Sequence, residues 1–208
     1  DIFDYSTAIE KGYIESDYFV WWGYEDAILY EIAKDELTRL AADKQPFNLT
    51  FLTVDQHYFN GYVWEKCGNE YDVQLANVLA CSDRLLIDFI EWCKQQDFYE
   101  DTVIVISGDH PRMDTVLVEN IDYTERTVYN CFINTERTVA LSEKNRKFTT
   151  MDMFPTVLYA LGFDIEGDRL GLGTNLFSSE QTLAEKFGYA YIDEELSKSS
   201  LYYISHFS

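Results

Sequence analysis

The stretch Thr102-Val-Ile-Val-Ile-Ser-Gly-Asp-His110 decides how this chain folds. Its β-branched run, residues 102–107, is typical of a strand buried on both faces of a parallel sheet. The strand delivers a carboxylate and an imidazole, Asp109 and His110, to the carboxyl edge of the sheet, where ligands bind in open α/β folds. An Asp oxygen and a His nitrogen suit a divalent metal such as Zn²⁺ or Mn²⁺. The alternative is an ordinary strand-end turn, in which Asp109 caps a loop and His110 is a surface residue.

A second apolar, β-branched run ends in the same way. Residues 47–54 lead directly into Asp55-Gln56-His57, so that two of the three histidines of the chain follow predicted strands. Because the carboxyl ends of parallel strands meet at one edge of a sheet, His57 and the Asp109–His110 pair are expected to share a site.

Helical patterns alternate with the predicted strands. Apolar residues at helical spacing predict helices at about 25–43 and 72–97, and a further helix at 150–161 with Gly162 as its stop. Parallel central strands are predicted at about 47–54, 102–108 and 128–134, and one or two short helices after Thr182. Helices between parallel strands predict an α/β fold, a three-layer α/β/α arrangement with a mostly parallel central sheet. Residues 1–208 show no linker or repeat, which favours a single domain.

The composition limits the partners of the chain. Its 208 residues, 47% of them hydrophobic, are enough to bury a core. The net charge of −21 argues against nucleic acid and against electrostatic docking on anionic lipid. A phosphorylated substrate stays open, because a metal can supply local positive charge. The sequence has neither an apolar run of membrane-spanning length nor a signal peptide pattern. It starts in mid-pattern without Met, and we expect it to be a piece of a longer protein.

The four cysteines predict one disulfide. None of them has the CxxC spacing of a zinc site or a redox motif. Cys67 lies in a loop and Cys81 in the following helical pattern, and a bond between them would close a short loop. Cys93 and Cys131 are expected to be plain buried thiols.

Two further features favour structural interpretations. Gly171-Leu-Gly173 follows no strand and opens no evident helix, so a tight turn is favoured over a dinucleotide-binding loop. His206 lies almost at the end of the sequence and is expected on the surface.

Several motifs together resemble one family. Their order and spacing are similar to the sulfatase-like domain of lipoteichoic acid synthases and phosphoglycerol transferases, in the alkaline phosphatase superfamily, and the tail is most similar to the phosphoglycerol transferases. The motifs are Trp22-Gly-Tyr-Glu-Asp26, Thr53-Val-Asp-Gln-His57, Phe98 to His110, Asp152-Met-Phe-Pro-Thr156 and Arg169-Leu-Gly-Leu-Gly-Thr-Asn-Leu-Phe-Ser178.

The resemblance implies a metal-dependent transfer of phosphoglycerol from a phosphatidylglycerol-type donor to a glycan or glycerol-polymer acceptor. It implies a Thr nucleophile and a metal, Mn²⁺ before Mg²⁺ or Zn²⁺, with Asp109 and His110 as two of its ligands. It places His57 on the donor phosphate and Trp22 near the glycerol headgroup. Arg112 is a candidate for the same phosphate, with a solvated loop arginine as the alternative. The implied location is the outer face of the cytoplasmic membrane or the periplasm, in a membrane-anchored parent.

The chain departs from the family pattern in two ways. The family carries its Thr nucleophile and an acidic metal ligand upstream of the Trp-Gly motif, and residues 1–21 hold no matching context. We therefore expect no catalytic nucleophile within residues 1–208 and only half of the metal site. Many relatives have Thr or Ser before the motif His, where this chain has Gln56. The aromatic residues after His57 either wall a headgroup pocket or cover the sheet edge: Tyr58, Phe59, Tyr62 and Trp64.

Two other functions remain open on the sequence alone. The fold can serve as a non-catalytic binding module, or the parent can be a related sulfatase or phosphodiesterase. A sulfatase would need a Cys or Ser nucleophile in a Cys-x-Pro-x-Arg context, and this chain has none.

Overall fold

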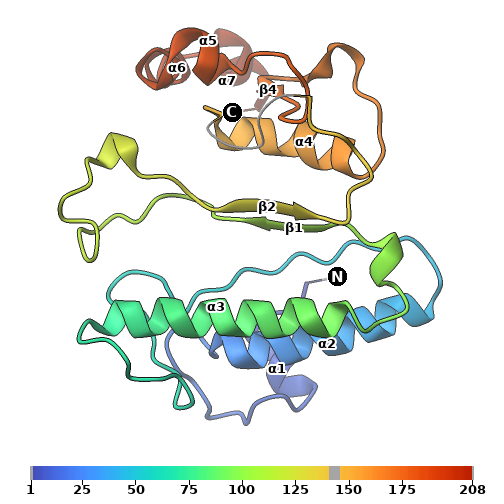
Figure 1. Cartoon of the computed structure of the whole chain (residues 1–208), viewed down its shortest axis with the longest axis vertical. Coiled ribbons are helices and arrows are strands. Elements are labelled where there is room, and N and C mark those ends of the chain that lie inside the picture. The colour runs from blue at the N-terminus through green and yellow to red at the C-terminus, as the bar shows by residue number, and fades with distance from the viewer. Residues whose placement is uncertain (1, 141–145, 208) are drawn as a thin grey trace. The chain divides into compact units, whose positions relative to one another are not determined.

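The computed structural model describes residues 2–140 and 146–207, and its elements are drawn in Figure 1. The chain divides into two compact units. The first comprises residues 1–101 and 110–127, and the second comprises residues 102–109 and 128–208.

The first unit is built on helices. They are α1 (Tyr5–Glu10), α2 (Asp26–Ala42) and α3 (Gln74–Cys93), with short 3₁₀ turns at Tyr99–Asp101 and Tyr123–Glu125. The two long helices confirm those predicted at 25–43 and 72–97. In Figure 1, α2 and α3 lie side by side, in agreement with their contacts.

Part of the core of the first unit lies between α2 and α3. Tyr30 of α2 packs against Phe89 of α3 with ring centroids 5.1 Å apart, and both are buried. Phe51 completes the group at 5.5 Å from Phe89 and 5.7 Å from Tyr30. The segment 47–54 is therefore attached to the helices through an aromatic side chain, which is a large apolar contact.

The strand predicted at 47–54 is absent from the part of the chain that the structure describes. Its residues join no ladder, and Leu52 is exposed. At its end, the Val54 and Asp55 amides donate to a side chain, that of Asp26. The β-branched composition correctly indicated an extended, packed segment, but a strand also needs a neighbouring backbone to pair with.

The predicted disulfide is confirmed. Cys67 in the loop before α3 is bonded to Cys81 within the helix, with Cα atoms 5.3 Å apart. The bond ties the loop that follows His57 to the face of α3. Cys93 is a buried free thiol, and burial raises its pKa to about 11. Cys131 is free and half-buried.

The second unit contains the strands β1 (Ile104–Ser107) and β2 (Asn130–Ile133). They pair antiparallel, with Ile104 opposite Ile133 and Ser107 opposite Asn130. The prediction that 102–108 and 128–134 are parallel is therefore wrong. The connection between them contains no helix beyond one 3₁₀ turn, whereas a parallel pair needs a crossover, usually helical. Both strands are half-buried.

Short helices form the rest of the second unit. A 3₁₀ turn (Thr150–Asp152) runs into α4 (Met153–Ala160), which confirms the helix predicted at 150–161. The tail contains short helices as expected, but three of them where one or two were predicted: α5 (Leu183–Phe187), α6 (Tyr189–Leu196) and α7 (Leu201–Phe207). His206, in α7, is exposed as predicted. No helix in residues 2–140 or 146–207 is both long and apolar enough to cross a membrane.

The Gly171–Gly173 segment is a turn, as predicted. It joins two short antiparallel strands, β3 (Arg169–Leu170), which follows a 3₁₀ turn (Glu166–Asp168), and β4 (Gly173–Thr174). A Cβ atom at Gly173 would lie 2.0 Å from the Met151 carbonyl oxygen, so only glycine fits there. The buried Asp152 stabilises this close approach of Gly173 to Met151, because its Oδ1 accepts from the Thr174 amide at 2.8 Å.

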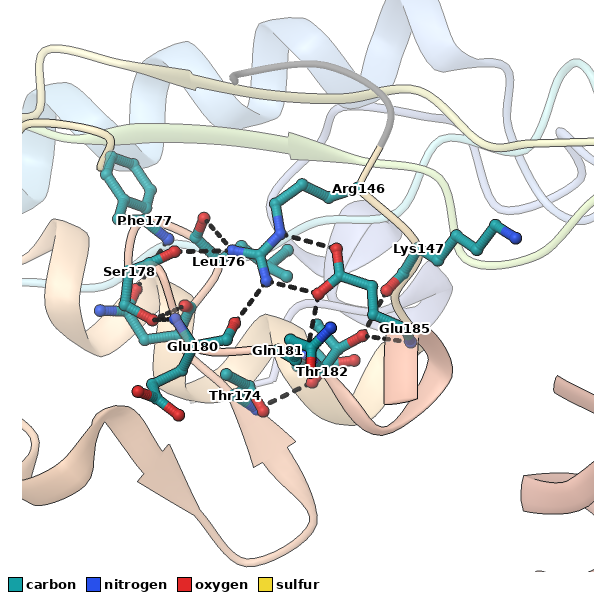
Figure 2. Close-up of polar contacts among 12 residues, drawn as sticks. Arg146, Lys147, Thr174, Leu176, Phe177, Ser178, Glu180, Gln181, Thr182 and Glu185 are labelled. Atoms are coloured by element: carbon teal, nitrogen blue, oxygen red, sulfur yellow. Dashed lines mark hydrogen bonds and ion pairs between the residues drawn. The ribbon is translucent and has the colours of Figure 1, made fainter. Parts of the chain in front are cut away.

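Arg146 fastens the tail of the second unit (Figure 2). Its Nε and Nη2 donate to the Glu185 carboxylate at 2.9 and 2.7 Å. Its remaining donors reach the carbonyl oxygens of Leu176, Ser178 and Glu180 at 2.6–3.0 Å. All five guanidinium N–H groups are thus used within the protein. The hydrogen bond from Arg146 is the main cause that lowers the pKa of Glu185, to about 2.

We predict that Glu185→Gln destabilises the chain in a pH-dependent way. Because the Glu185 pKa is lower in the folded than in the unfolded state, its contribution is complete above about pH 4.5 and disappears as pH falls toward 2. Urea denaturation should give a loss of about 1–3 kcal/mol at pH 7, shrinking toward pH 2.5. The control is Glu195→Gln, which removes an exposed ion pair with Lys198 and should leave stability nearly unchanged, because exposed ion pairs contribute little. Equal losses in both variants at pH 7 would contradict the assignment.

Candidate functional site

The first unit brings together the three residues predicted to contact substrate. Trp22 precedes α2, His57 follows the 47–54 segment, and Arg112 comes from the polar loop after the predicted Asp-His pair. They are 35 and 55 residues apart in sequence (57 − 22 and 112 − 57). Two contacts bring them together. The Trp22 ring lies against the His57 ring, and the Arg112 guanidinium donates to the backbone carbonyl of Gln56.

Trp22 lies against His57. The ring centroids are 4.1 Å apart with the planes inclined at 50°, and 58% of Trp22 remains exposed. The turn from Val20 to Gly23 sets this arrangement, since the two residues form a bridge and Trp21 between them adopts a left-handed φ of 52°. Trp21 turns the other way, and its Nε1 donates to the Val54 carbonyl at 3.0 Å. One tryptophan therefore anchors the turn while the other stays accessible.

The backbone fixes the orientation of the His57 ring. His57 Nδ1 lies 2.9 Å from the Tyr58 carbonyl oxygen, and a carbonyl only accepts hydrogen bonds, so this contact places the proton on Nδ1. In the neutral ring Nε2 then carries the lone pair, and in the protonated ring it is a second donor. The His57 amide donates to the Val54 carbonyl at 2.9 Å, which closes the turn beneath the ring.

Arg112 lies directly behind the histidine turn. Its Nη1 donates to the Gln56 carbonyl at 2.7 Å, while Nε and Nη2 bind the Asp114 carboxylate. The hydrogen bond from Arg112 lowers the pKa of Asp114. Arg112 is half-buried, so it differs from the solvated loop arginine that was the alternative interpretation. Three of its five N–H groups make these bonds.

Sequence reasoning missed a second arginine at this place. Arg126 Nη1 donates to the carbonyl oxygens of Arg112 and Asp114 at 3.0 and 2.6 Å, and its guanidinium lies over the Tyr123 ring. Its Nε is buried and makes no hydrogen bond in the described structure. One guanidinium group, that of Arg112, therefore contacts the His57 turn, and a second, that of Arg126, contacts the Arg112 and Asp114 backbone, in a chain whose net charge is −21. Nothing in the sequence around Arg126 sets it apart from other loop arginines.

Two buried aspartates hold the histidine turn on the first turn of α2. Asp26 Oδ1 accepts from the Val54 amide at 2.8 Å, and Oδ2 accepts from the Asp55 amide at 3.1 Å. In return, Asp55 Oδ2 accepts from the Asp26 amide at 3.2 Å. The Glu25 side chain does not cap the helix, and it accepts from the Tyr18 hydroxyl instead. Asp55 thus does the work of an N-cap residue from 29 positions away.

The environment of Asp55 favours its neutral form. Burial, followed by the charge of Asp26, raises the pKa of Asp55 to about 7. Its Oδ1 is buried and has no hydrogen-bond partner in the described structure. Burial also raises the pKa of Asp26, although the Val54 and Asp55 amides act in the opposite direction. Because Asp26 has two amide donors and Asp55 only one, Asp55 is the member that keeps the proton.

The chain folds back tightly after His57. Gly61 has φ +73°, and a Cβ atom there would lie 2.6 Å from the Asp55 carbonyl oxygen. Its amide donates to the His57 carbonyl at 3.1 Å, and the Tyr62 amide donates to the Asp55 carbonyl at 2.7 Å. A glycine is required both by the backbone conformation and by the close approach.

The aromatic residues after His57 divide between two roles. Tyr58 and Phe59 are exposed and meet edge to face at 4.8 Å. Tyr62 packs against Trp21 at 6.5 Å, and Trp64 lines a cavity of about 270 Å³ beside the Cys67 loop. Covering the turn is therefore the role of Tyr62, while Tyr58 and Phe59 remain available to a ligand.

The Asp-His pair lies where β1 ends. Asp109 follows the strand in the second unit, and His110 begins the returning loop in the first. His110 Nδ1 lies 2.9 Å from the Pro111 carbonyl oxygen, which places the proton on Nδ1 and the lone pair of the neutral ring on Nε2. Metal-binding histidines commonly make such a bond. The donor types fit a divalent metal, but within residues 2–140 and 146–207 no group of three His, Cys, Asp or Glu side chains gathers in a way that could hold one.

Known proteins resemble this chain in sequence. The family model for Sulfatase matches residues 1–163. Phosphoglycerol transferase I of Salmonella choleraesuis (strain SC-B67) is 31% identical over 176 residues, which cover 80% of this chain and 22% of that protein. Phosphoglycerol transferase I of Escherichia coli (strain 55989 / EAEC) is also 31% identical over the same lengths. The chain thus spans about a fifth of the length of these relatives.

A solved structure has the same fold. A protein in the alkaline phosphatase superfamily from Vibrio parahaemolyticus superposes with a TM-score of 0.58 at 22% sequence identity, covering 78% of this chain and 42% of that one. The likeness confirms the predicted α/β class. The family model, which covers more than half of the sequence, leads to one conclusion: this chain belongs to the sulfatase family.

Proposed function

We propose that this chain is part of a metal-dependent phosphoglycerol transferase that uses a phosphatidylglycerol-type donor. In this proposal the acceptor is a glycan or a glycerol polymer. The enzyme works in a membrane-anchored parent, at the outer face of the cytoplasmic membrane or in the periplasm. The chain itself supplies the binding site for the phosphoglycerol headgroup.

The observation that carries the proposal is the contact of Trp22 with His57, with Arg112 directly behind it. When protonated, His57 Nε2 can donate to a nonbridging phosphate oxygen. The exposed indole of Trp22 offers an apolar face to the glycerol carbons. Phosphoryl transfer depends chiefly on positioning and on neutralising phosphate charge, which these groups supply.

The local charge supports a phosphate ligand. The chain as a whole repels anions, with 37 acidic against 16 basic residues. Beside the His57 turn, however, Arg112 brings a guanidinium that is ion-paired with Asp114, and Arg126 donates to the carbonyl oxygens of Arg112 and Asp114. Guanidinium groups at this place offer an anionic headgroup a local cationic contact on an acidic protein.

Asp109 and His110 are proposed as two ligands of the metal, which we expect to be Mn²⁺, with Mg²⁺ or Zn²⁺ as alternatives. Such an ion, when bound, lowers the pKa of a hydroxyl nucleophile and neutralises phosphate oxygens. Two ligands are too few for a complete site, since protein sites generally use three or more. We therefore propose that the remaining ligands and the Thr nucleophile come from other parts of the parent.

We predict that the 208-residue chain binds glycerol 1-phosphate through His57 and Trp22. Replacing His57 with Ala removes a charge-assisted hydrogen bond, which contributes about 1.5–3 kcal/mol. Isothermal titration should therefore show the dissociation constant rising about tenfold to a hundredfold, with a smaller rise for Trp22→Ala. The control His206→Ala removes an exposed histidine of α7 and should leave binding unchanged. Unaltered affinity in His57→Ala would remove His57 from the site.

Turnover separates a complete enzyme from a part of one. We predict that the 208-residue chain, supplied with Mn²⁺ and phosphatidylglycerol, releases no phosphoglycerol. The parent should be active and should lose at least about 90% of its turnover in His57→Ala, by loss of the same interaction. Cleavage by the 208-residue chain alone would place the nucleophile within it. An inactive parent that still binds glycerol 1-phosphate would favour the non-catalytic binding module.

A further inference from the structure

We propose that Asp26 and Asp55 form a carboxyl latch: while Asp55 carries a proton, the pair fastens the Thr53–His57 segment to the first turn of α2, and loss of that proton releases His57. In this account Asp26 is a positioning residue for the histidine and Asp55 makes the positioning depend on pH. The latch depends on the proposed function only for the role given to His57, which is to bind the donor phosphate.

The hydrogen bonds show why the pair fastens this segment. The two oxygens of Asp26 take the Val54 and Asp55 amides, and one oxygen of Asp55 takes the Asp26 amide. All three bonds lie at the end of the segment that carries His57. Asp26 and Asp55 are 1% and 3% exposed, so water cannot substitute for these contacts without opening the structure.

The surroundings of the pair contain acidic and phenolic groups. Glu25 is buried on the same turn of α2, where the Tyr18 hydroxyl donates to it at 2.7 Å. Burial raises the pKa of Tyr30 of α2 and of Tyr62 in the loop after His57, and the charge of Asp55 contributes to both increases. Within the described residues, no lysine or arginine is among the groups that shift the pKa of Asp55. A second negative charge here would be buried without compensation, and opening toward water relieves it.

The sign of the pH effect follows from the direction of the shift. Asp55 titrates at a higher pH in the folded than in the unfolded state, so the latch is fully closed at low pH and is lost as pH rises through the folded value, about 7. A carboxylate paired with a cation, such as Glu185, behaves in the opposite way: its pKa is lower in the folded state, so its contribution is present at high pH and is lost as pH falls.

Two isosteric variants separate the roles of the two carboxyl groups. Asn at position 26 has a single acceptor oxygen, so one of the Val54 and Asp55 amides would face an NH₂ group. Asn at position 55 keeps an oxygen for the Asp26 amide and places its NH₂ where Oδ1 has no partner. Asp26→Asn should therefore open the latch at every pH, whereas Asp55→Asn should hold it closed at every pH.

Amide hydrogen exchange in the ligand-free 208-residue chain tests the latch by NMR. In the wild type, exchange of the Val54 and Asp55 amides, corrected for its intrinsic pH dependence, should accelerate at least about tenfold between pH 5.5 and 8.5. Asp55→Asn should abolish that acceleration. Asp26→Asn should exchange at the fast rate throughout, and the Trp22–His57 ring contact should weaken with it. The control Asp35→Asn changes an exposed carboxylate elsewhere on α2 and should match the wild type.

The outcomes separate the latch from the proposed function, because no donor or phosphate is present. A flat wild-type profile, or Asp55→Asn behaving like Asp26→Asn, would overturn the latch and leave headgroup binding to be judged on its own assay. Should Asp26→Asn not fold, the wild-type profile and Asp55→Asn still decide the question. Loss of glycerol 1-phosphate binding with these exchange profiles intact would overturn the proposed function and leave the latch standing.

Discussion

The reciprocal contact between Asp26 and Asp55 is the constraint on which the candidate site depends. It joins the amino end of α2 to the turn that carries His57, and it does so with backbone amides that would otherwise lack partners. The Trp21 indole and the close approach of Gly61 to the Asp55 carbonyl hold the same turn from two other sides. The histidine is thus supported by a rigid frame although the segment before it joins no sheet, as a site on a loop requires.

The distribution of charge gives this frame a chemical purpose. The buried acids Asp26 and Asp55 lie at the turn that carries His57, where Asp26 accepts from the Val54 and Asp55 amides. Arg112 and Arg126 lie in the loop that follows the Asp-His pair, and each donates hydrogen bonds to backbone carbonyl oxygens. Their guanidinium groups are therefore held in place by the fold, and under the proposed function this would reduce the entropy lost when the headgroup binds.

Sequence patterns predicted part of this organisation for clear physical reasons. The apolar spacing that identified α2 and α3 reflects the faces they bury, and the Cys67–Cys81 bond followed from loop and helix patterns. The β-branched run at 102–107 predicted a strand correctly but not its direction, since composition reports burial and the connection decides orientation. The helix-poor loop between β1 and β2 was the signal for an antiparallel pair. Neither the capping of α2 by Asp55 nor the position of Arg126 could be predicted, because both depend on partners distant in sequence.

The titration of the two carboxyl groups tests the central claim most directly. Carbon-detected NMR of the 208-residue chain can follow the side-chain carboxyl carbons of Asp26 and Asp55 from pH 3 to 9. The buried pair predicts that Asp55 titrates near pH 7, with the Val54 and Asp55 amide shifts following the same midpoint. If Asp55 instead titrated near 4, as an ordinary aspartate does, and the amide shifts did not respond, the two carboxyl groups would not form the constraint described here.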